Sequence, residues 1–213
     1  MGKIYDSLLS GSSGRTGRVV IANINGHEIS RIRPRKRTKT PTEKQQLVRD
    51  RMKVCVDFMV SYRAFACKHY GYRTGMRSCY NQAFTNLTTS FGIDYTTFSI
   101  VPDYAKIAFA KGGLLAVIPT SIAIPTPNTI EITWQNNAGS NPDRETDMLQ
   151  ILVAFENEIN TNFIENAAPR LDETYTLNLT NYQLGKVLHF WIAFRAIDEL
   201  SVSNSIYLGS ITT

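Results

Sequence analysis

The residues whose type and spacing could do chemistry are basic, and they cluster within "RIRPRKRTK", residues 31–39. Guanidinium and ammonium groups in such a row bind phosphates or carboxylates. Because Pro34 favours extended backbone at the residue before it, we expect alternate arginines to project from one side of a strand-like arm. Like charges repel, so the arm should become ordered only against an acidic partner. Together with basic residues of the helix predicted below, the candidate contacts with an acidic protein surface or a polyanion are Arg31, Arg33, Arg35, Lys36, Arg37, Lys39, Lys44, Arg49 and Arg51.

The cysteines and histidines do not form a recognisable catalytic or metal-binding pattern. Cys55, Cys67 and Cys79 are twelve residues apart and never form a C-x-x-C pair, whereas a structural zinc site needs four clustered ligands. His69 could pair with Cys67 or Cys79, but no motif orients such a pair. We therefore interpret the cysteines as small buried thiols in a reducing compartment, and we predict no metal and no cofactor.

Acidic residues gather after the turn-rich segment "NNAGSNP". Asp143, Glu145 and Asp147 follow it at two-residue spacing. Carboxylates in a solvated loop lack the burial that separates a general acid from a general base. The segment also does not match an EF-hand loop, so we predict neither an active site nor a calcium site there. The expected protein is not an enzyme.

The charge is unevenly distributed along the chain. The formal net charge is +5, but residues 1–77 hold 17 of the 23 basic residues and only 5 of the 18 acidic ones. This part therefore carries +12 and the remainder −7. A molecule with a basic front and an acidic back attracts polyanions, and it equally attracts other copies of itself. A hydrophobic fraction of 43% is enough for a sizeable core.

Residues 19–32, "VVIANINGHEISRI", are typical of a β-hairpin. Asn25-Gly26 between two apolar runs is a strong hairpin signal, because a type I′ turn requires positive φ at both central positions. The preceding "SGSSGRTGR" indicates a flexible connector and does not match a phosphate-binding P-loop. Residues 1–39 are thus predicted to be a basic N-terminal arm with a hairpin.

The next segment, residues 40–96, is predicted to be helical. "TPTE" supplies an N-cap threonine, a proline at the first helical position and a glutamate at the third, which is a capping box. We expect a long helix from residue 41 to about residue 69, and a shorter one over residues 78–88 that packs against it. The inward stripe of the long helix should be Val48, Met52, Cys55, Met59, Tyr62 and Ala66.

From residue 97 onward apolar and polar residues alternate, as they do in strands with one buried face. "TIEITW", "MLQILVAF", "YTLNL" and "SNSIYLGS" are such strands, and "LHFWIAFRA" is apolar on both faces, which is typical of a central strand. Six or seven short strands indicate an antiparallel β-sandwich over residues 97–213, and the fold class is α+β. This region resembles a fibronectin type III or other immunoglobulin-like domain, although the Cys-Trp-Cys spacing of disulfide-linked immunoglobulin domains is absent.

Several short motifs are distributed over the whole chain: the opening "MGKI", a glycine-rich loop, the Arg-Pro-Lys-rich stretch, "TPTEKQ" and the late "SNSIYLG". Together they resemble an uncharacterised family of about this length from Bacteroidota and their phages. That family has no assigned activity, so the resemblance implies kinship and supplies no site residues.

The sequence favours a non-enzymatic structural protein that assembles into homo-oligomers through its N-terminal arm and contacts other structural proteins, as a phage virion component in a neck, tail or capsid would. Exposed hairpin edges can pair with a neighbour, and the acidic half supplies a surface for the arm. The alternative is a non-specific nucleic-acid-binding protein, for which about five phosphate contacts would give a log–log salt slope of about −4.5 on duplex DNA. The N-terminus lacks the apolar stretch of a signal peptide and no apolar run reaches membrane length, so we expect a non-secreted, cytoplasmically made protein without membrane contact.

Overall fold

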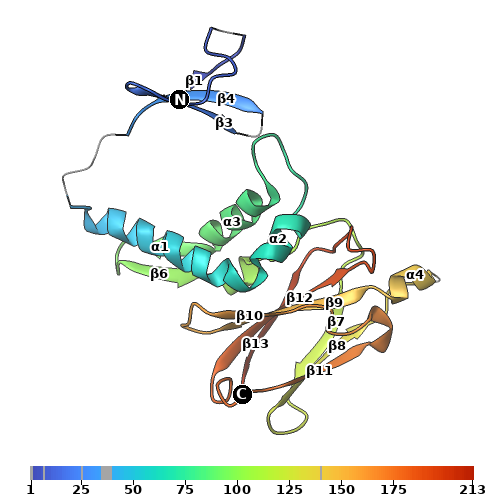
Figure 1. The fold of residues 1–213 in the computed structure, drawn as a ribbon. Helices are drawn as coiled ribbons and strands as arrows, with labels where there is room; N and C mark the ends of the chain where they lie inside the picture. Colours follow the sequence, from blue (N-terminus) through green and yellow to red (C-terminus); the bar gives the residue numbers. More distant parts are fainter. Residues whose placement is uncertain (1, 7, 25, 35–39, 140) are drawn as a thin grey trace. The chain divides into compact units, whose positions relative to one another are not determined.

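A computed structural model describes residues 2–6, 8–24, 26–34, 40–139 and 141–213 (Figure 1). Its contacts divide the chain into two compact units. The N-terminal unit comprises residues 1–42 and 74–76, and the body comprises residues 43–73 and 77–213. The body therefore includes nearly all of the predicted helical segment, residues 40–96, together with the predicted sandwich, residues 97–213. The two are one unit because helices and strands share a core, as shown below.

The N-terminal unit is a small antiparallel sheet with the strand order β1-β4-β3-β2. Its strands are β1 (Gly2–Lys3), β2 (Gly14–Thr16), β3 (Val19–Ile24) and β4 (His27–Ile32). The predicted hairpin is confirmed, because β3 and β4 pair from Val19 opposite Ile32 to Ile24 opposite His27. Gly26 in the connecting turn has a φ of +84°, a conformation that glycine adopts without strain.

The long helix predicted from residue 41 to about residue 69 is divided. Three pieces replace it: α1 (Glu43–Met59), the 3-10 turn η1 (Val60–Tyr62) and α2 (Arg63–His69). The hydroxyl of Thr161 donates a 2.8 Å hydrogen bond to the carbonyl oxygen of Phe58, which in an unbroken α-helix would accept from the amide of residue 62. A side chain inserted into the hydrogen-bond ladder in this way interrupts a helix. The contact comes from a distant part of the chain, so the helical pattern did not reveal it.

The shorter helix predicted over residues 78–88 is confirmed as α3 (Cys79–Ser90). Ser78 is its N-cap, and the Ser78 hydroxyl accepts a 3.2 Å hydrogen bond from the amide of Asn81. Leu87 is fully buried, and Tyr80 and Phe84 pack against the core that this helix shares with α1, so the predicted packing of the two helices is confirmed. None of the helices in the described parts of the chain is long and apolar enough to cross a membrane.

Antiparallel strands make up the rest of the body. After the hairpin of β5 (Phe91–Asp94) and β6 (Ser99–Pro102) come two sheets, with the strand orders β10-β9-β12-β13 and β11-β8-β7. Their strands are β7 (Ile118–Ala123), β8 (Thr129–Gln135), β9 (Met148–Phe155), β10 (Thr161–Ile164), β11 (Thr174–Asn178), β12 (Val187–Arg195) and β13 (Ile206–Thr212). Short helical turns lie between them: η2 (Tyr104–Lys106), α4 (Pro142–Glu145) and η3 (Arg170–Asp172). The body is thus α+β, with two antiparallel sheets.

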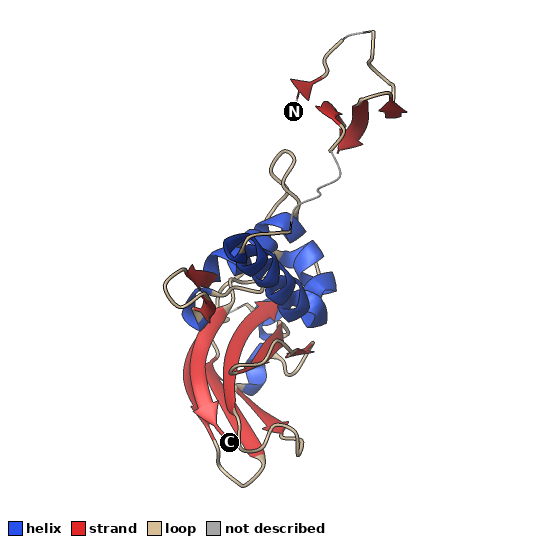
Figure 2. Cartoon of the chain, turned by 90° about the vertical axis from the view of Figure 1, so that its left-hand side faces the viewer, coloured by secondary structure: helices blue, strands red, loops and turns tan. Residues whose placement is uncertain are grey.

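The larger sheet is the middle layer of the body and is buried on both faces. On β12, Phe190 and Ile192 pack into a core shared with the smaller sheet, whereas Trp191 and Ala193 pack into a core shared with α1, α2 and α3. In Figure 2 the helices lie against the strands of the body. This arrangement explains why "LHFWIAFRA" is apolar on both faces, because alternate side chains of one strand enter different cores.

Candidate functional site

One face of the N-terminal sheet carries three basic side chains. Lys3 of β1 pairs with Ile29 of β4. Two residues further along β4, Arg31 pairs with Val20 of β3, and Arg15 of β2 pairs with the same valine. Residues directly opposite each other in an antiparallel pair point to one face, as do residues two apart in a strand. Lys3, Arg15 and Arg31 therefore share a face; all three are exposed, and we call this surface the cationic face.

The opposite face of the same sheet has a different character. Ile21 pairs with Ser30, Val19 pairs with Ile32, and Thr16 of β2 pairs with Val19. None of the described strand residues on this face is basic. A loop reaches it, because the amide of Gly11 donates a 2.6 Å hydrogen bond to the Glu28 carboxylate. The positive charge of the sheet strands is thus concentrated on one side.

The N-terminal sheet has almost no core. Ile21 and Ile29 are the buried apolar residues among its described positions, with 5% and 7% of their surface exposed. They point to opposite faces, since Ile21 pairs with Ser30 and Ile29 with Ala22. Other apolar side chains of the unit, including Leu8 and Ile32, are largely exposed. A sheet with one buried side chain on each face has little internal packing to hold it.

The other basic residues predicted as contacts fall in three places. Arg33 follows β4, and its amide donates a 2.8 Å hydrogen bond to the carbonyl of Arg18. Lys44 and Arg51 lie seven residues apart on α1, on one side of the helix, whereas Arg49 lies on another side. The Lys44 ammonium is 5.7 Å from the centre of the Tyr95 ring. Outside the described residues lie Arg35, Lys36, Arg37 and Lys39.

The inward stripe predicted for the long helix is correct at four of its six positions. Cys55, Met59, Tyr62 and Ala66 are buried, but Val48 and Met52 are 36% and 42% exposed. The reason is that the core against which α1 packs begins near Val54. The first half of α1 therefore extends beyond the core of the body, and it presents apolar side chains between basic ones.

The three histidines occupy unrelated environments. His27 begins β4, whereas His69 and His189 are buried in the body. The His189 ring stacks on Tyr104 with 3.7 Å between ring centres, and its Nδ1 lies 2.8 Å from the Tyr207 hydroxyl. Burial lowers the pKa of both His69 and His189, so both stay neutral near pH 7. In the described part of the chain, no group of three or more His, Cys, Asp and Glu residues could hold a metal ion.

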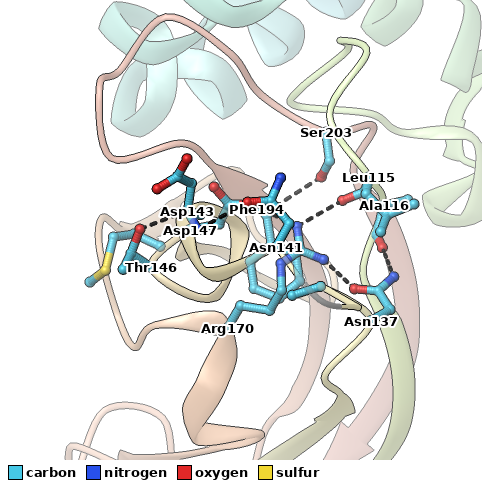
Figure 3. A network of polar contacts seen from close by, with 12 residues as sticks. Leu115, Ala116, Asn137, Asn141, Asp143, Thr146, Asp147, Arg170, Phe194 and Ser203 are labelled. Carbon is cyan, nitrogen blue, oxygen red and sulfur yellow. Dashed lines mark hydrogen bonds and ion pairs between the residues drawn. The ribbon is translucent and has the colours of Figure 1, made fainter.

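The acidic segment after "NNAGSNP" is not wholly solvated, which corrects the sequence prediction. Asp143 is exposed on α4, but Asp147 is buried and forms a 2.9 Å ion pair with the fully buried Arg170 (Figure 3). The same guanidinium donates to the carbonyl of Leu115 at 3.1 Å and to the side chain of Asn137. The sequence pattern missed this because the partner of Asp147 lies more than twenty residues away in η3.

The Arg170 network joins separate loops of the body. Its guanidinium carbon lies 3.9 Å from the centre of the Phe194 ring, and the Arg170 carbonyl accepts a 3.0 Å hydrogen bond from the Trp134 indole. The two rings belong to β12 and β8, which come from different sheets. Figure 3 shows Arg170 among Asp147, Asn137 and Phe194. The Arg170 guanidinium is thus surrounded by hydrogen-bond acceptors and an aromatic ring, and the network has a structural role, which is to hold these loops together.

Comparisons with known proteins place the chain in a family. No curated protein matches it. Among solved structures, the fn3 domain of the human collagen alpha-1(XX) chain is similar over 49% of this chain and 84% of that chain, with 10% sequence identity and a TM-score of 0.32. The model of a family of unknown function, DUF6266, matches residues 11–209. Since the match covers most of the sequence, the chain belongs to the DUF6266 family.

Proposed function

We propose that this chain is a non-enzymatic structural protein that assembles with other copies of itself through its N-terminal unit. The observation that carries the proposal is the lack of a core in that unit, where one isoleucine is buried on each face of the sheet. Units well below about 70 residues usually need disulfides, a metal or oligomerisation to be stable. The three cysteines all lie in the body. Packing against a partner would supply the apolar burial that the sheet lacks.

The charge distribution supports an acidic surface as the partner. The cationic face presents Lys3, Arg15 and Arg31. Arg33 lies two residues after Arg31 in the sequence, immediately after the end of β4. The first half of α1 adds exposed apolar residues flanked by basic ones. The excess of acidic residues beyond residue 77 offers a complementary surface on another copy. Contacts of this type join the front of one molecule to the back of the next, which builds rings or filaments.

The proposal extends to the fold of the body and to the setting of the assembly. Counted from β7, the first, second and fifth strands form one sheet, and the third, fourth, sixth and seventh form the other. The immunoglobulin constant type differs in one strand, because its fourth strand pairs in the first sheet. We therefore propose an immunoglobulin-like sandwich. Two further parts of the proposal rest on the sequence alone: that the assembled particle is a phage virion, and that the chain is not secreted.

The test is the molar mass of the full-length protein after nuclease treatment, measured by light scattering behind size-exclusion chromatography. We expect a defined oligomer for the natural chain and a monomer for Arg15→Glu/Arg31→Glu, which reverses the charge of the cationic face. The matched control is Arg63→Glu/Lys106→Glu, which reverses two exposed charges of the body and should remain oligomeric. A natural chain that is monomeric at every concentration, or equal behaviour of the two variants, would refute assembly through this face.

Binding of nucleic acid is the second candidate, and the cationic face is the observation that favours it. Lys3 and Arg31 lie on the adjacent strands β1 and β4, whereas Arg15 lies on β2, on the far side of β3. Adjacent strands lie about 4.8 Å apart, so the three cations are spread over about 15 Å of one sheet face and form a patch for phosphates. Three contacts would give a log–log salt slope of about −2.7 on duplex DNA. The ratio of absorbance at 260 and 280 nm across the same chromatogram separates the candidates. A monomer that retains nucleic acid until salt is raised would favour this second function.

A further inference from the structure

The body contains a basic pocket where α2 ends and α3 begins. Its volume is about 400 Å³, which lies within the range of small-molecule sites. His69 ends α2, and Cys79 is the first residue of α3. The other walls come from the segment around Gly112 and from the loop that contains Leu200. The pocket lies entirely within the body and does not include any residue of the cationic face.

The pocket carries uncompensated positive charge. Lys68 and Lys111 both line it, and within the described chain neither lysine forms an ion pair. No aspartate or glutamate is part of its lining. Glu165 and Glu199, whose charges act on His69, each contact Arg195 instead, at 3.8 and 3.2 Å. The lysine charges therefore remain available to a ligand.

Backbone hydrogen bonds hold the segment that carries Lys111. The Lys111 amide donates to the carbonyl of His69 at 3.1 Å, and the Lys111 carbonyl accepts from the amide of Gly71 at 2.6 Å. The amide of Gly112 donates to the Asn204 side chain at 3.2 Å. Glycine is required at this position because a Cβ would lie 2.1 Å from the Val202 carbonyl oxygen. Lys111 is thus fixed against the end of α2, and the entropic penalty of ordering its backbone on binding is avoided.

The first residue of α3 adds a third favourable element. A helix of twelve residues directs amide groups and the positive end of its dipole toward its N-terminus, where Cys79 lines the pocket. Leu114, Leu200 and Val202 also line the pocket and provide an apolar wall. The combination of cationic groups and an apolar wall distinguishes this pocket from a generally basic surface.

We propose that this pocket binds an oxyanion, a phosphate or carboxylate group, on a small compound with an apolar or aromatic body. The two lysines and the N-terminus of α3 would contact the anionic group, and the apolar wall would contact the body of the ligand. A phosphate monoester carries close to two negative charges at neutral pH and matches two lysines better than a carboxylate does. The site shares no residue with the cationic face, and the proposal does not depend on the proposed assembly.

The experiment uses full-length protein and three probes: inorganic phosphate, phenyl phosphate and benzoate. Titrations followed by calorimetry, and by amide chemical shifts of Lys111, Gly112 and Gly113, measure affinity and location together. We expect phenyl phosphate to bind more tightly than inorganic phosphate, because its ring buries apolar surface, and benzoate to bind more weakly than phenyl phosphate. Equal affinities of phenyl phosphate and benzoate would still support the proposal, and they would show that the site accepts carboxylates as well as phosphates.

Substitutions separate the two parts of the site. Lys68→Gln and Lys111→Gln should each weaken phenyl phosphate by about tenfold or more, because each removes a charged hydrogen-bond donor. Leu200→Ser should weaken phenyl phosphate and leave inorganic phosphate unchanged; Leu200 is 83% exposed, so folding is not at stake. Lys53→Gln, on the exposed surface of α1, is the control for net charge and should bind all probes normally.

Three results would overturn the proposal. The first is no saturable binding of any of the three probes at millimolar concentration. The second is unchanged affinity in both pocket lysine variants. The third is an equal loss in Lys53→Gln, which would show that the anions respond to net charge and not to the pocket.

Discussion

Replacing Asp147 with leucine should lower the free energy of unfolding by about 3–5 kcal/mol, because it leaves a buried guanidinium without its counter-charge. The side chains of Arg170 and Asp147 are 0% and 3% exposed, so water does not replace the lost partner. In a domain of this size, each kcal/mol shifts Tm by about 2–4 °C, which gives an expected decrease of roughly 6–20 °C. The control is Asp143→Leu, which removes an exposed carboxylate from α4 and should change stability by less than about 0.5 kcal/mol.

The double variant Asp147→Leu/Arg170→Met gives the sharper result. Burial raises the pKa of Asp147 and lowers the pKa of Arg170, in spite of their contact, so the loss of hydration outweighs their attraction. Removing both charges should therefore recover part of the stability lost in Asp147→Leu, although Asn137 and the Leu115 carbonyl lose a donor. Urea unfolding of the natural chain, both single variants and the double variant measures the coupling.

The pH dependence of Arg170→Met provides an independent check. Without the guanidinium the pKa of Asp147 should rise further above its ordinary value. A carboxyl group whose folded pKa is raised stabilises the fold below its ordinary pKa, and that contribution is lost as pH rises through the raised pKa. The variant should thus be less destabilised at about pH 5 than at about pH 7. The reasoning is refuted if Asp147→Leu unfolds like Asp143→Leu, or if the double variant is less stable than Asp147→Leu.

Three further measurements test other parts of the structure. Gly112→Ala should destabilise the body by about 2 kcal/mol or more, because its Cβ would collide with the Val202 carbonyl; Gly113→Ala, which has open space around its Cβ, should be nearly neutral in the same urea titration. A thiol reagent should modify the exposed Cys67 rapidly. Cys55 should react only on unfolding, because burial raises its pKa to about 11. A rapid phase of undiminished size in Cys67→Ser would contradict this. Burial lowers the pKa of His69 and His189, so the stability that they contribute above their ordinary pKa should be lost as pH falls through the lowered values. The variant His69→Gln/His189→Gln should therefore show a weaker dependence of the unfolding free energy on pH between about pH 7 and pH 5.

Local patterns in the sequence predicted local structure well. Asn25-Gly26 placed the hairpin, and Ser78 marked the start of α3. The doubly apolar "LHFWIAFRA" indicated a central strand, and β12 is central. In each case the information lies within about ten neighbouring residues, where turn chemistry, capping and periodicity operate.

Features that depend on distant contacts were not predictable. The break between α1 and α2 lies where Thr161 of β10 bonds to the Phe58 carbonyl, and Asp147 is buried in contact with Arg170. Strands of two or three residues, such as β1 and β2, are too short to show any periodicity. The sequence therefore singled out Arg31 on the cationic face but not Lys3 or Arg15, which join it only through strand pairing.

The double burial of the larger sheet determines which fragment of this chain can be moved into another protein. A β-sandwich whose two sheets each have a solvent-exposed outer face can be excised and inserted into another protein as an independent domain. Here, cutting at the predicted boundary before residue 97 would strip α1, α2 and α3 from β9 and β12 and expose Leu152 and Trp191 to water. Such a fragment would aggregate through that apolar surface. A transplantable piece of the body must therefore include α1, α2 and α3 together with the sheets, so recombination and protein engineering must treat helices and sheets as one module.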